Sequence, residues 1–431
     1  MSGDGGGSLR LFRNTEFVAL ASTAFARSQA YSTVLIALAL YADLFGTSGT
    51  VEGLFGTVFA IMQLVVVLPL GRYIDTGNSK RFLLVGLAIN VAVFVGFAMV
   101  QTVEHVLVVR VLQGLGASVL WLTGGAVTGE ISPDDSRGLW LGTYNQVGAF
   151  SSLAGDLVGG YLLYVYGFKW TYAVLIAITT LAMVAVFFFL RDNPGGRADP
   201  EDSTGLETYR TLLDRTAIRA LVLFRVAFSF GKMAVIIFVP IYAKTGGFGI
   251  NEFVVGGIMA GGKLTKSLTQ GWIGDLTDRL GNRYYFVLAG ALVYAVGTAM
   301  IPLAEFAGDL FPAVTLGVMG GLLLPPAFFA LFAAYAVLGV ADSLRLPASM
   351  ALFVEEGEHF EAVAGSLSLR SIAWKFGQIL GPVTVGIVWD VTSVFVAFGV
   401  AAGMLVLSAA VFAVLYAVEP APEGVEVAAG D

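Results

Sequence analysis

Charged side chains lie in the middle of long apolar stretches of this sequence, where they are costly and therefore candidates for a functional site. Two of them are acids, Asp156 and Asp342. Six are cations: Arg27, Lys232, Lys263, Lys266, Arg345 and Lys375. Because two carboxylates cannot neutralise six cations, we expect a positive interior that holds an anion and repels other cations. The alternative is that the cations only form structural ion pairs.

The spacing of these residues places polar side chains on common helical faces. Lys263 and Lys266 are three residues apart, and Asp342 and Arg345 are also three apart and are expected to pair. Aromatic side chains in the same stretches would pack against the apolar part of an amphiphilic anion. The predicted substrate-binding residues are Arg27, Tyr31, Arg110, Gln113, Asn145, Lys232, Lys263, Lys266, Arg345, Trp374, Lys375 and Gln378.

A carboxylate beside a cation can exchange a proton as its surroundings alternate. Asp342 and Asp156 are therefore the candidates for proton coupling, with Asp342 slightly favoured because Arg345 lies one turn away. Arg110 and Arg225 lie near the ends of their apolar stretches, from which their guanidinium groups can reach the interface.

The composition excludes several other classes of protein. The chain has 431 residues, of which 57% are hydrophobic and 13% charged, and its mean hydropathy is +0.82. Most of such a surface must face lipid. No Cys and only two His are present, which argues against a metal centre, a cofactor or a catalytic triad. The net charge of −7 argues against a nucleic-acid partner.

The helices that position the charges follow from the length of each apolar stretch, because a membrane-spanning helix needs about 20 residues. The sequence predicts an all-α membrane protein with twelve spans in two six-helix bundles. The predicted spans are 17–42, 53–73, 82–101, 107–129, 140–163, 170–190, 220–242, 253–274, 284–304, 328–354, 366–389 and 393–417.

These spans give two bundles, 1–190 and 220–418, a polar linker, 191–219, and an acidic tail, 419–431. With the N-terminus inside, fourteen Lys and Arg are counted on the inner side, including Arg72 and Arg370 near the inner ends of their spans. Two, Lys169 and Lys244, lie in outside segments. This asymmetry predicts that both termini and the tail are cytoplasmic.

The segment 308–326 fits this pattern badly, because the apolar part between Pro312 and Pro325 is too short to cross. We expect an external re-entrant or interfacial segment, or an extension of the tenth helix.

A charged turn occurs twice, each time after the second span of a bundle. "GRYIDTGNSKR" runs from Gly71 to Arg81, and "GWIGDLTDRLGNR" runs from Gly271 to Arg283. Two further motifs are "RVLQGLGAS" (110–118) and "GDLVGG" (155–160), and "GQILGP" (377–382) is a similar element in the eleventh span. Together they resemble the motifs of the major facilitator superfamily, with the "GDLVGG" motif resembling that of its proton-coupled exporters.

The resemblance implies a gate on the cytoplasmic side. In that family the turn aspartate caps a helix N-terminus of the opposite bundle, where the helix dipole favours a negative charge. Asp75 and Asp278 would do so here. The gate residues expected on this basis are Asp75, Lys80, Arg81, Glu130, Asp278, Arg279, Arg283 and Glu355. The alternative is that the cations of these turns only set the topology.

The sequence therefore predicts a monomeric secondary transporter in the cell membrane that works by alternating access. Its expected partners are an anionic small molecule, protons and membrane lipid. A proton-coupled multidrug antiporter and a flippase for lipid-linked solutes are the alternatives. A membrane-embedded enzyme is disfavoured, because no nucleophile with a base and no cluster of metal ligands is present.

Overall fold

The computed structural model of the chain describes residues 7–133, 136–192, 206–317, 321–359 and 362–417. Within these ranges, the side chains of residues 7, 68, 71–76, 206–208, 278 and 364 lie outside the described part. The first half of the chain contains α1 (Gly7–Leu11), α2 (Thr15–Phe45), α3 (Gly49–Thr76), α4 (Ser79–Ala98), α5 (Val103–Ile131) and α6 (Arg137–Phe189).

The second half contains three further long helices before an irregular segment and three after it. These elements are α7 (Leu206–Asp214), α8 (Thr216–Thr245), α9 (Glu252–Leu280), α10 (Arg283–Met300), η3 (Ile301–Phe306), α11 (Ala307–Leu310), β1 (Val314–Leu316), β2 (Leu322–Leu324), α12 (Pro326–Glu358), α13 (Val363–Val391) and α14 (Val394–Ala417).

The helices account for the expected membrane crossings. Ten helices of the described chain are long and apolar enough to cross a membrane. One of them, α6, holds two spans, because Gly167 with φ 68° breaks its 53 residues into two helices. The more polar α9 is also long enough, with 29 residues. The ten helices, the second span of α6 and the span formed by α9 together give the twelve predicted spans.

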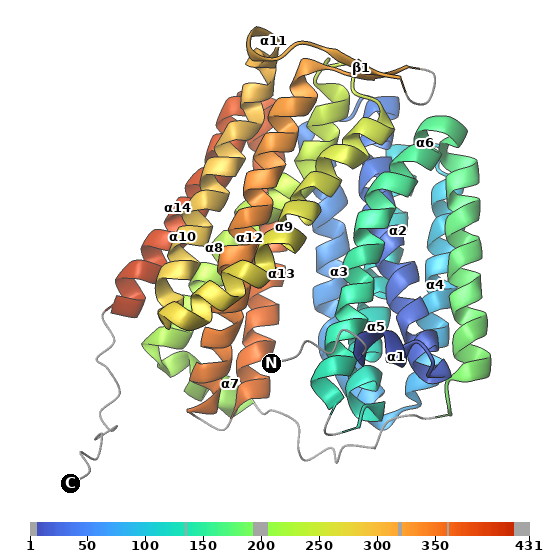
Figure 1. Ribbon diagram of the computed structural model, residues 1–431, viewed down its shortest axis with the longest axis vertical. Coiled ribbons are helices and arrows are strands. Elements are labelled where there is room, and N and C mark those ends of the chain that lie inside the picture. Colours follow the sequence, from blue (N-terminus) through green and yellow to red (C-terminus); the bar gives the residue numbers. More distant parts are fainter. Residues whose placement is uncertain (1–6, 134–135, 193–205, 318–320, 360–361, 418–431) are drawn as a thin grey trace.

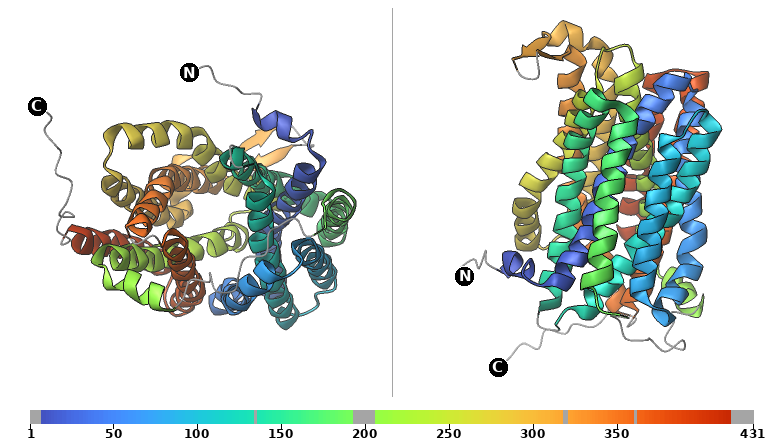
Figure 2. Two further views of the ribbon diagram at one scale, coloured as in Figure 1. Left: turned by 90° about the horizontal axis from the view of Figure 1, so that it is seen from below. Right: turned by 90° about the vertical axis from the view of Figure 1, so that its right-hand side faces the viewer.

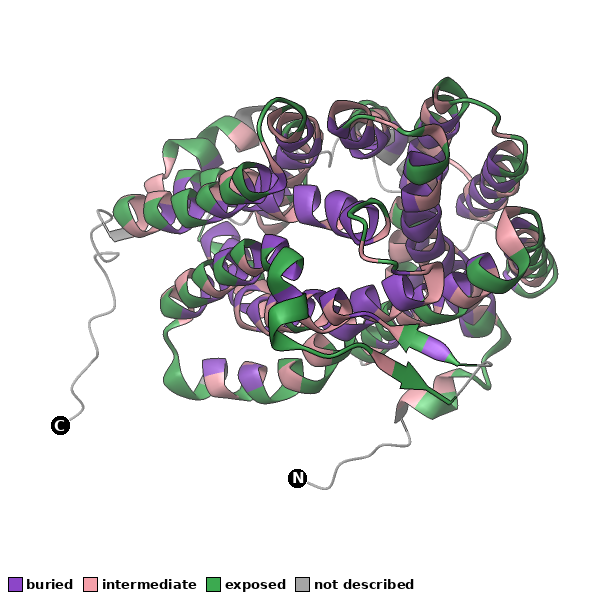
Figure 3. Cartoon of the chain, turned by 90° about the horizontal axis from the view of Figure 1, so that it is seen from above, coloured by how far each residue is buried: buried purple, intermediate pink, exposed green. Residues whose placement is uncertain are grey.

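The helices gather into two groups of similar size. Helices α2–α6 lie beside helices α8–α14 (Figures 1 and 2), and we call these groups the first half and the second half. Buried residues concentrate where helices face one another, and exposed residues face outward (Figure 3). Leu181 and Phe188 are 69% and 71% exposed on that outer surface. Such an apolar outer surface is suited to lipid.

The helix ends form where short polar residues satisfy free backbone groups. The Asn14 side chain accepts hydrogen bonds from the backbone of Glu16 and Phe17 at the start of α2. Asn251 does the same for Val254 in α9. Both charged turns connect helices as predicted. The first joins α3 to α4, and the second joins α9 to α10 through Gly281, whose φ is 67°.

The glycine motifs allow helices to approach one another closely. A Cβ on Gly155 of α6 would lie 2.4 Å from the carbonyl oxygen of Gln29 in α2. A Cβ on Gly381 of α13 would lie 2.1 Å from the carbonyl oxygen of Phe230 in α8. The two motifs therefore play equivalent parts: each packs a helix closely against the first long helix of its own half.

The segment 308–326 differs from two of the three expectations. The described part neither re-enters the bundle nor extends the tenth span, because α12 begins only at Pro326. Instead β1 and β2 form an antiparallel hairpin, with Val314 opposite Leu324, at the end of the molecule away from α7 (Figure 1). Pro312 and Pro325 lack the backbone N–H that a continuous helix needs, which explains the break.

Candidate functional site

A buried ion pair joins the two halves near the middle of the molecule. The Asp156 side chain of α6 is fully buried, and its Oδ2 lies 2.6 Å from Nζ of Lys263 on α9. Nζ of Lys263 also donates to Oγ of Ser32 at 2.8 Å and to the carbonyl oxygen of Ser152 at 3.1 Å. The sequence identified Asp156 and Lys263 separately. It did not predict that they pair, because they belong to different halves.

The backbones of α6 and α9 touch at this place. A Cβ on Gly256 of α9 would lie only 2.1 Å from the carbonyl oxygen of Asp156. One helical turn further along α6, a Cβ on Gly160 would lie 2.8 Å from the carbonyl oxygen of Glu252. Glycine is therefore required for the close approach that brings Lys263 to Asp156.

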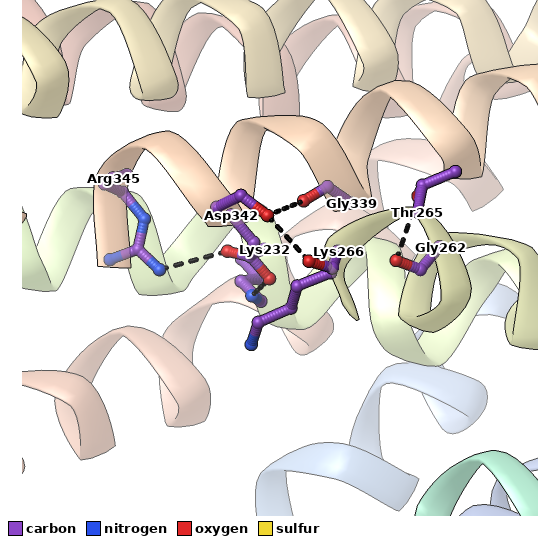
Figure 4. A network of polar contacts seen from close by, with 8 residues as sticks. Lys232, Gly262, Thr265, Lys266, Gly339, Asp342 and Arg345 are labelled. Atoms are coloured by element: carbon purple, nitrogen blue, oxygen red, sulfur yellow. Dashed lines mark hydrogen bonds and ion pairs between the residues drawn. The ribbon is translucent and has the colours of Figure 1, made fainter. Parts of the chain in front are cut away.

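A second charged group lies within the second half. Lys232 of α8 forms an ion pair with Asp342 of α12, and Nη2 of Arg345 lies 3.1 Å from the other oxygen of the same carboxylate. Figure 4 shows both cations directed at Asp342, with the Lys266 side chain nearby. The predicted pairing of Asp342 with Arg345 is observed, and Lys232 is an additional partner that sequence spacing could not reveal.

Three of the six mid-span cations form no ion pair with an acid among the described residues. Nζ of Lys375 on α13 donates instead to two amide oxygens, that of Gln63 across the interface and that of Gln378 at 3.2 Å. The Arg27 guanidinium lies 4.6 Å from the ring centre of Trp121, which is 66% exposed. Lys266 is the third cation that forms no ion pair with an acid. The predicted excess of interior cations over acids is therefore present.

Arg110 and Gln113 are engaged in holding α5 against α3. Nε of Arg110 donates to the carbonyl oxygen of Phe55 at 2.7 Å, and Nη1 donates to Oε1 of Gln113 at 2.6 Å. The guanidinium also lies 4.3 Å from the ring centre of Phe59. Tyr31 packs on the same Phe59, with ring centres 5.8 Å apart.

The expectation that Arg110 and Arg225 reach the interface is wrong, since only 1% and 7% of these residues is exposed. Their helices begin earlier than predicted, at Val103 and Thr216, so both arginines lie deeper. Arg370, counted on the inner side near the end of its predicted span, likewise lies deeper, because α13 begins at Val363. The guanidinium of Arg225 lies 4.3 Å from the ring centre of Trp374. Asn145, by contrast, is exposed on α6.

The predicted gate residues lie at the end of the molecule that carries α7. Arg283 forms an ion pair with Glu355, and both belong to the expected gate residues. Lys80 pairs instead with Asp192 at 3.2 Å, and Arg279 pairs with Asp275 one turn earlier in its own helix at 2.8 Å. Arg81 and Glu130 are exposed. The side chains of Asp75 and Asp278 lie outside the described residues, so their capping role stays a prediction.

A cap of that kind occurs at the opposite end, where the sequence did not indicate it. Asp390 near the end of α13 accepts hydrogen bonds from the backbone N–H groups of Gly49 at 2.6 Å and Thr50 at 2.8 Å. The hydroxyl of Thr50 donates to the same carboxylate at 2.5 Å. A carboxylate of the second half thus caps the N-terminus of α3 in the first half, where the helix dipole favours it. Only its position at the end of a predicted span could have suggested this role.

Comparisons with known proteins agree with this arrangement. A family model described as Major Facilitator Superfamily matches residues 20–328. An uncharacterised MFS-type transporter of Methanocaldococcus jannaschii is 22% identical over 366 residues, covering 83% of this chain and 86% of that protein. The multidrug resistance protein MdtG of Dickeya zeae is 25% identical over 377 residues, covering 83% and 84%.

Solved structures show the same fold at low sequence identity. A bacterial homolog of the human lysosomal transporter Spinster superposes with a TM-score of 0.74 at 15% identity, covering 93% of this chain and 96% of that one. The peptide transporter POT gives 0.72 at 14% identity, covering 93% and 94%. With the family match over most of its length, the chain belongs to the major facilitator superfamily, whose members are membrane transporters and not enzymes.

Proposed function

We propose that the protein is a secondary active transporter that carries an organic anion by alternating access and couples it to protons. The observation that carries this proposal is the excess of mid-span cations over acids. Asp156 and Asp342 pair with three of the six cations, while Arg27, Lys266 and Lys375 form no ion pair with an acid among the described residues. Unpaired cations in a low-dielectric interior attract anions strongly.

The pair between Asp156 and Lys263 supports a mechanism for coupling. If an anion binds Lys263, the carboxylate of Asp156 loses the cation that pairs with it. A buried carboxylate without a counter-ion is costly and takes up a proton instead. Release of the anion restores the pair and expels the proton. Anion and proton then move together, which is symport.

Asp342 is the weaker of the two coupling candidates on this geometry. Its two cation partners, Lys232 and Arg345, both belong to its own half, so movement of one half against the other need not separate them. Asp156 and Lys263 belong to different halves, and alternating access requires the halves to move. The structure thus favours Asp156, which the sequence ranked second.

We also propose that the protein is a monomer in the cell membrane with both termini cytoplasmic. The end of the molecule that carries α7 would then face the cytoplasm, in line with the positive-inside rule. The contact between Asp390 and α3 would close the outer side. On this assignment the predicted gate residues lie on the inner side, as their proposed role requires.

Multidrug export is the second candidate, because several relatives are named multidrug resistance proteins. One transport assay separates the two. Proteoliposomes containing the purified chain would be offered benzoate, phenyl phosphate and the cation tetraphenylphosphonium, with and without an imposed pH gradient. We expect the gradient to drive uptake of an anion when the outside is acidic. Transport of tetraphenylphosphonium but of neither anion would favour the drug exporter and contradict the anion transporter.

A further inference from the structure

Three arginines from three helices converge in the second half, beside the charged group of Figure 4. Arg225 lies on α8, Arg345 on α12 and Arg370 on α13. Arg225 stacks on Trp374, which follows Arg370 by one helical turn. Arg345 lies 4.0 Å from the ring centre of Phe228, which follows Arg225 by three residues. Each guanidinium accordingly lies within electrostatic reach of the other two.

Five of the nine side-chain nitrogens of this arginine cluster donate no hydrogen bond to a described residue. Nε and Nη1 of Arg225, Nε and Nη1 of Arg345, and Nε of Arg370 are buried and donate to no described residue. Asp342 pairs with Arg345 only through Nη2 and is shared with Lys232. Buried arginine donors are normally paired, because an unpaired buried charge is costly. The cluster therefore presents buried, unpaired donors that suit an anion.

We propose that the arginine cluster binds a phosphate dianion, such as the phosphate group of a monoester. This inference rests on the proposed function and specifies its substrate class. The five free nitrogens carry seven N–H groups. These exceed the about four hydrogen bonds that the two oxygens of a carboxylate accept, whereas a monoester presents three terminal oxygens. Guanidinium groups bind phosphate through parallel N–H donors, and stacking on Phe228 and Trp374 fixes their planes.

The local charge also fits a dianion better than a monoanion. Arg225, Arg345 and Arg370, together with Lys232 and Lys266, contribute five positive charges, and Asp342 contributes one negative charge. The remaining excess of four positive charges falls to two when a phosphate dianion binds. Arg370 is only partly buried and lies seven residues from the start of α13. At 1.5 Å per residue this places Arg370 about 10 Å from that helix end.

The test compares anions that share one phenyl ring. The purified full chain in detergent is titrated with phenyl phosphate, benzenesulfonate and benzoate, and binding is followed by thermal stabilisation. We expect phenyl phosphate to bind about tenfold or more tightly than the two monoanions. Equal binding of all three would overturn the phosphate assignment. If benzoate is nevertheless transported under a pH gradient, the proposed function stands without this inference.

Variants test whether the arginine cluster is the binding site. Arg225→Gln and Arg370→Gln should each weaken phenyl phosphate binding about tenfold or more. Arg225→Lys keeps the charge without the planar fork and should give a smaller loss. The matched control is Arg219→Gln, an exposed arginine two turns earlier in the same helix, which should bind as the parent does. Size-exclusion profiles identify variants that do not fold. If Arg225→Gln does not fold, phenyl phosphate binding by Arg225→Lys is compared with that of the parent instead.

The same assay distinguishes two possible sources of the bound phosphate group. Inorganic phosphate and phenyl phosphate represent soluble ligands, and mixed micelles with phosphatidic acid represent a lipid headgroup. If soluble phosphates or phosphatidic acid stabilise the parent but not Arg225→Gln, the cluster is a phosphate site. If phosphatidic acid alone stabilises the parent, the ligand of that site is a lipid headgroup. Unchanged phenyl phosphate binding in folded Arg225→Gln and Arg370→Gln would overturn the proposal.

Discussion

Lys263 of α9 and Asp156 of α6 form an ion pair of 2.6 Å between the two halves of the transporter. Lys263 is the cation that makes burial of the Asp156 carboxylate tolerable. The backbone contact of Gly256 with Asp156 holds their helices together at the same level. We therefore expect both the stability of the protein and its transport to depend on this pair, and the two can be measured separately.

Replacing Lys263 by Gln should lower the thermal stability of the purified protein. The change leaves the carboxylate of Asp156 buried without its cation, and breaking a buried pair in this way costs about 3–5 kcal/mol. The double variant Asp156→Asn with Lys263→Gln removes both charges and should unfold at a higher temperature than Lys263→Gln alone. A double variant no more stable than Lys263→Gln would show that the pair is not coupled.

Replacing Asp342 by Asn should strengthen binding of the transported anion and leave proton coupling in place. The change releases Lys232 and Arg345 from their carboxylate, so both become available to the substrate. We expect a KM several-fold lower, with accumulation still driven by a pH gradient. Loss of that accumulation, with counterflow exchange retained, would instead support the coupling role that the sequence predicts for Asp342.

Replacing Asp390 by Asn should weaken closure of the end that carries the β-hairpin. A full charge at a helix N-terminus contributes about 0.3–2 kcal/mol, and here the helix belongs to the other half. Since the sequence has no Cys, a pair introduced at Gly56 and Ile237 reports closure without background. A Cβ at position 56 would lie 2.9 Å from Cγ1 of Ile237.

The crosslinking rate of that cysteine pair should fall when Asp390→Asn is added. Asp309, an exposed acid of α11 before the hairpin, supplies the control, and Asp309→Asn should leave the rate unchanged. A rate that is the same with and without Asp390→Asn would mean that the cap does not stabilise the closed outer side.

Asp75→Asn and Asp278→Asn should weaken closure of the opposite end by a similar amount, about 0.3–2 kcal/mol each. The prediction rests on the family resemblance of the two charged turns. A cysteine pair across that end should crosslink less readily in both variants. Unchanged crosslinking and unchanged transport in both would leave the turns as topology signals only.

The sequence predicted the fold well because each span is a continuous apolar stretch bounded by polar residues. It also located the mid-span charges, and it paired Asp342 with Arg345 because they lie on one helix. It could not pair Lys263 with Asp156, because contacts between helices depend on packing that sequence spacing does not encode. The depth of Arg225 was misjudged because its helix begins four residues before the apolar stretch does.

Uptake of anion into proteoliposomes by the Asp156→Asn variant tests the proposed mechanism most directly. Asn cannot bind and release the coupling proton, but it keeps the size of the side chain and leaves Lys263 able to bind the anion. We predict that Asp156→Asn loses accumulation driven by a pH gradient and retains counterflow exchange of the same anion. Accumulation against a gradient at the parent rate would contradict coupling through Asp156 and Lys263.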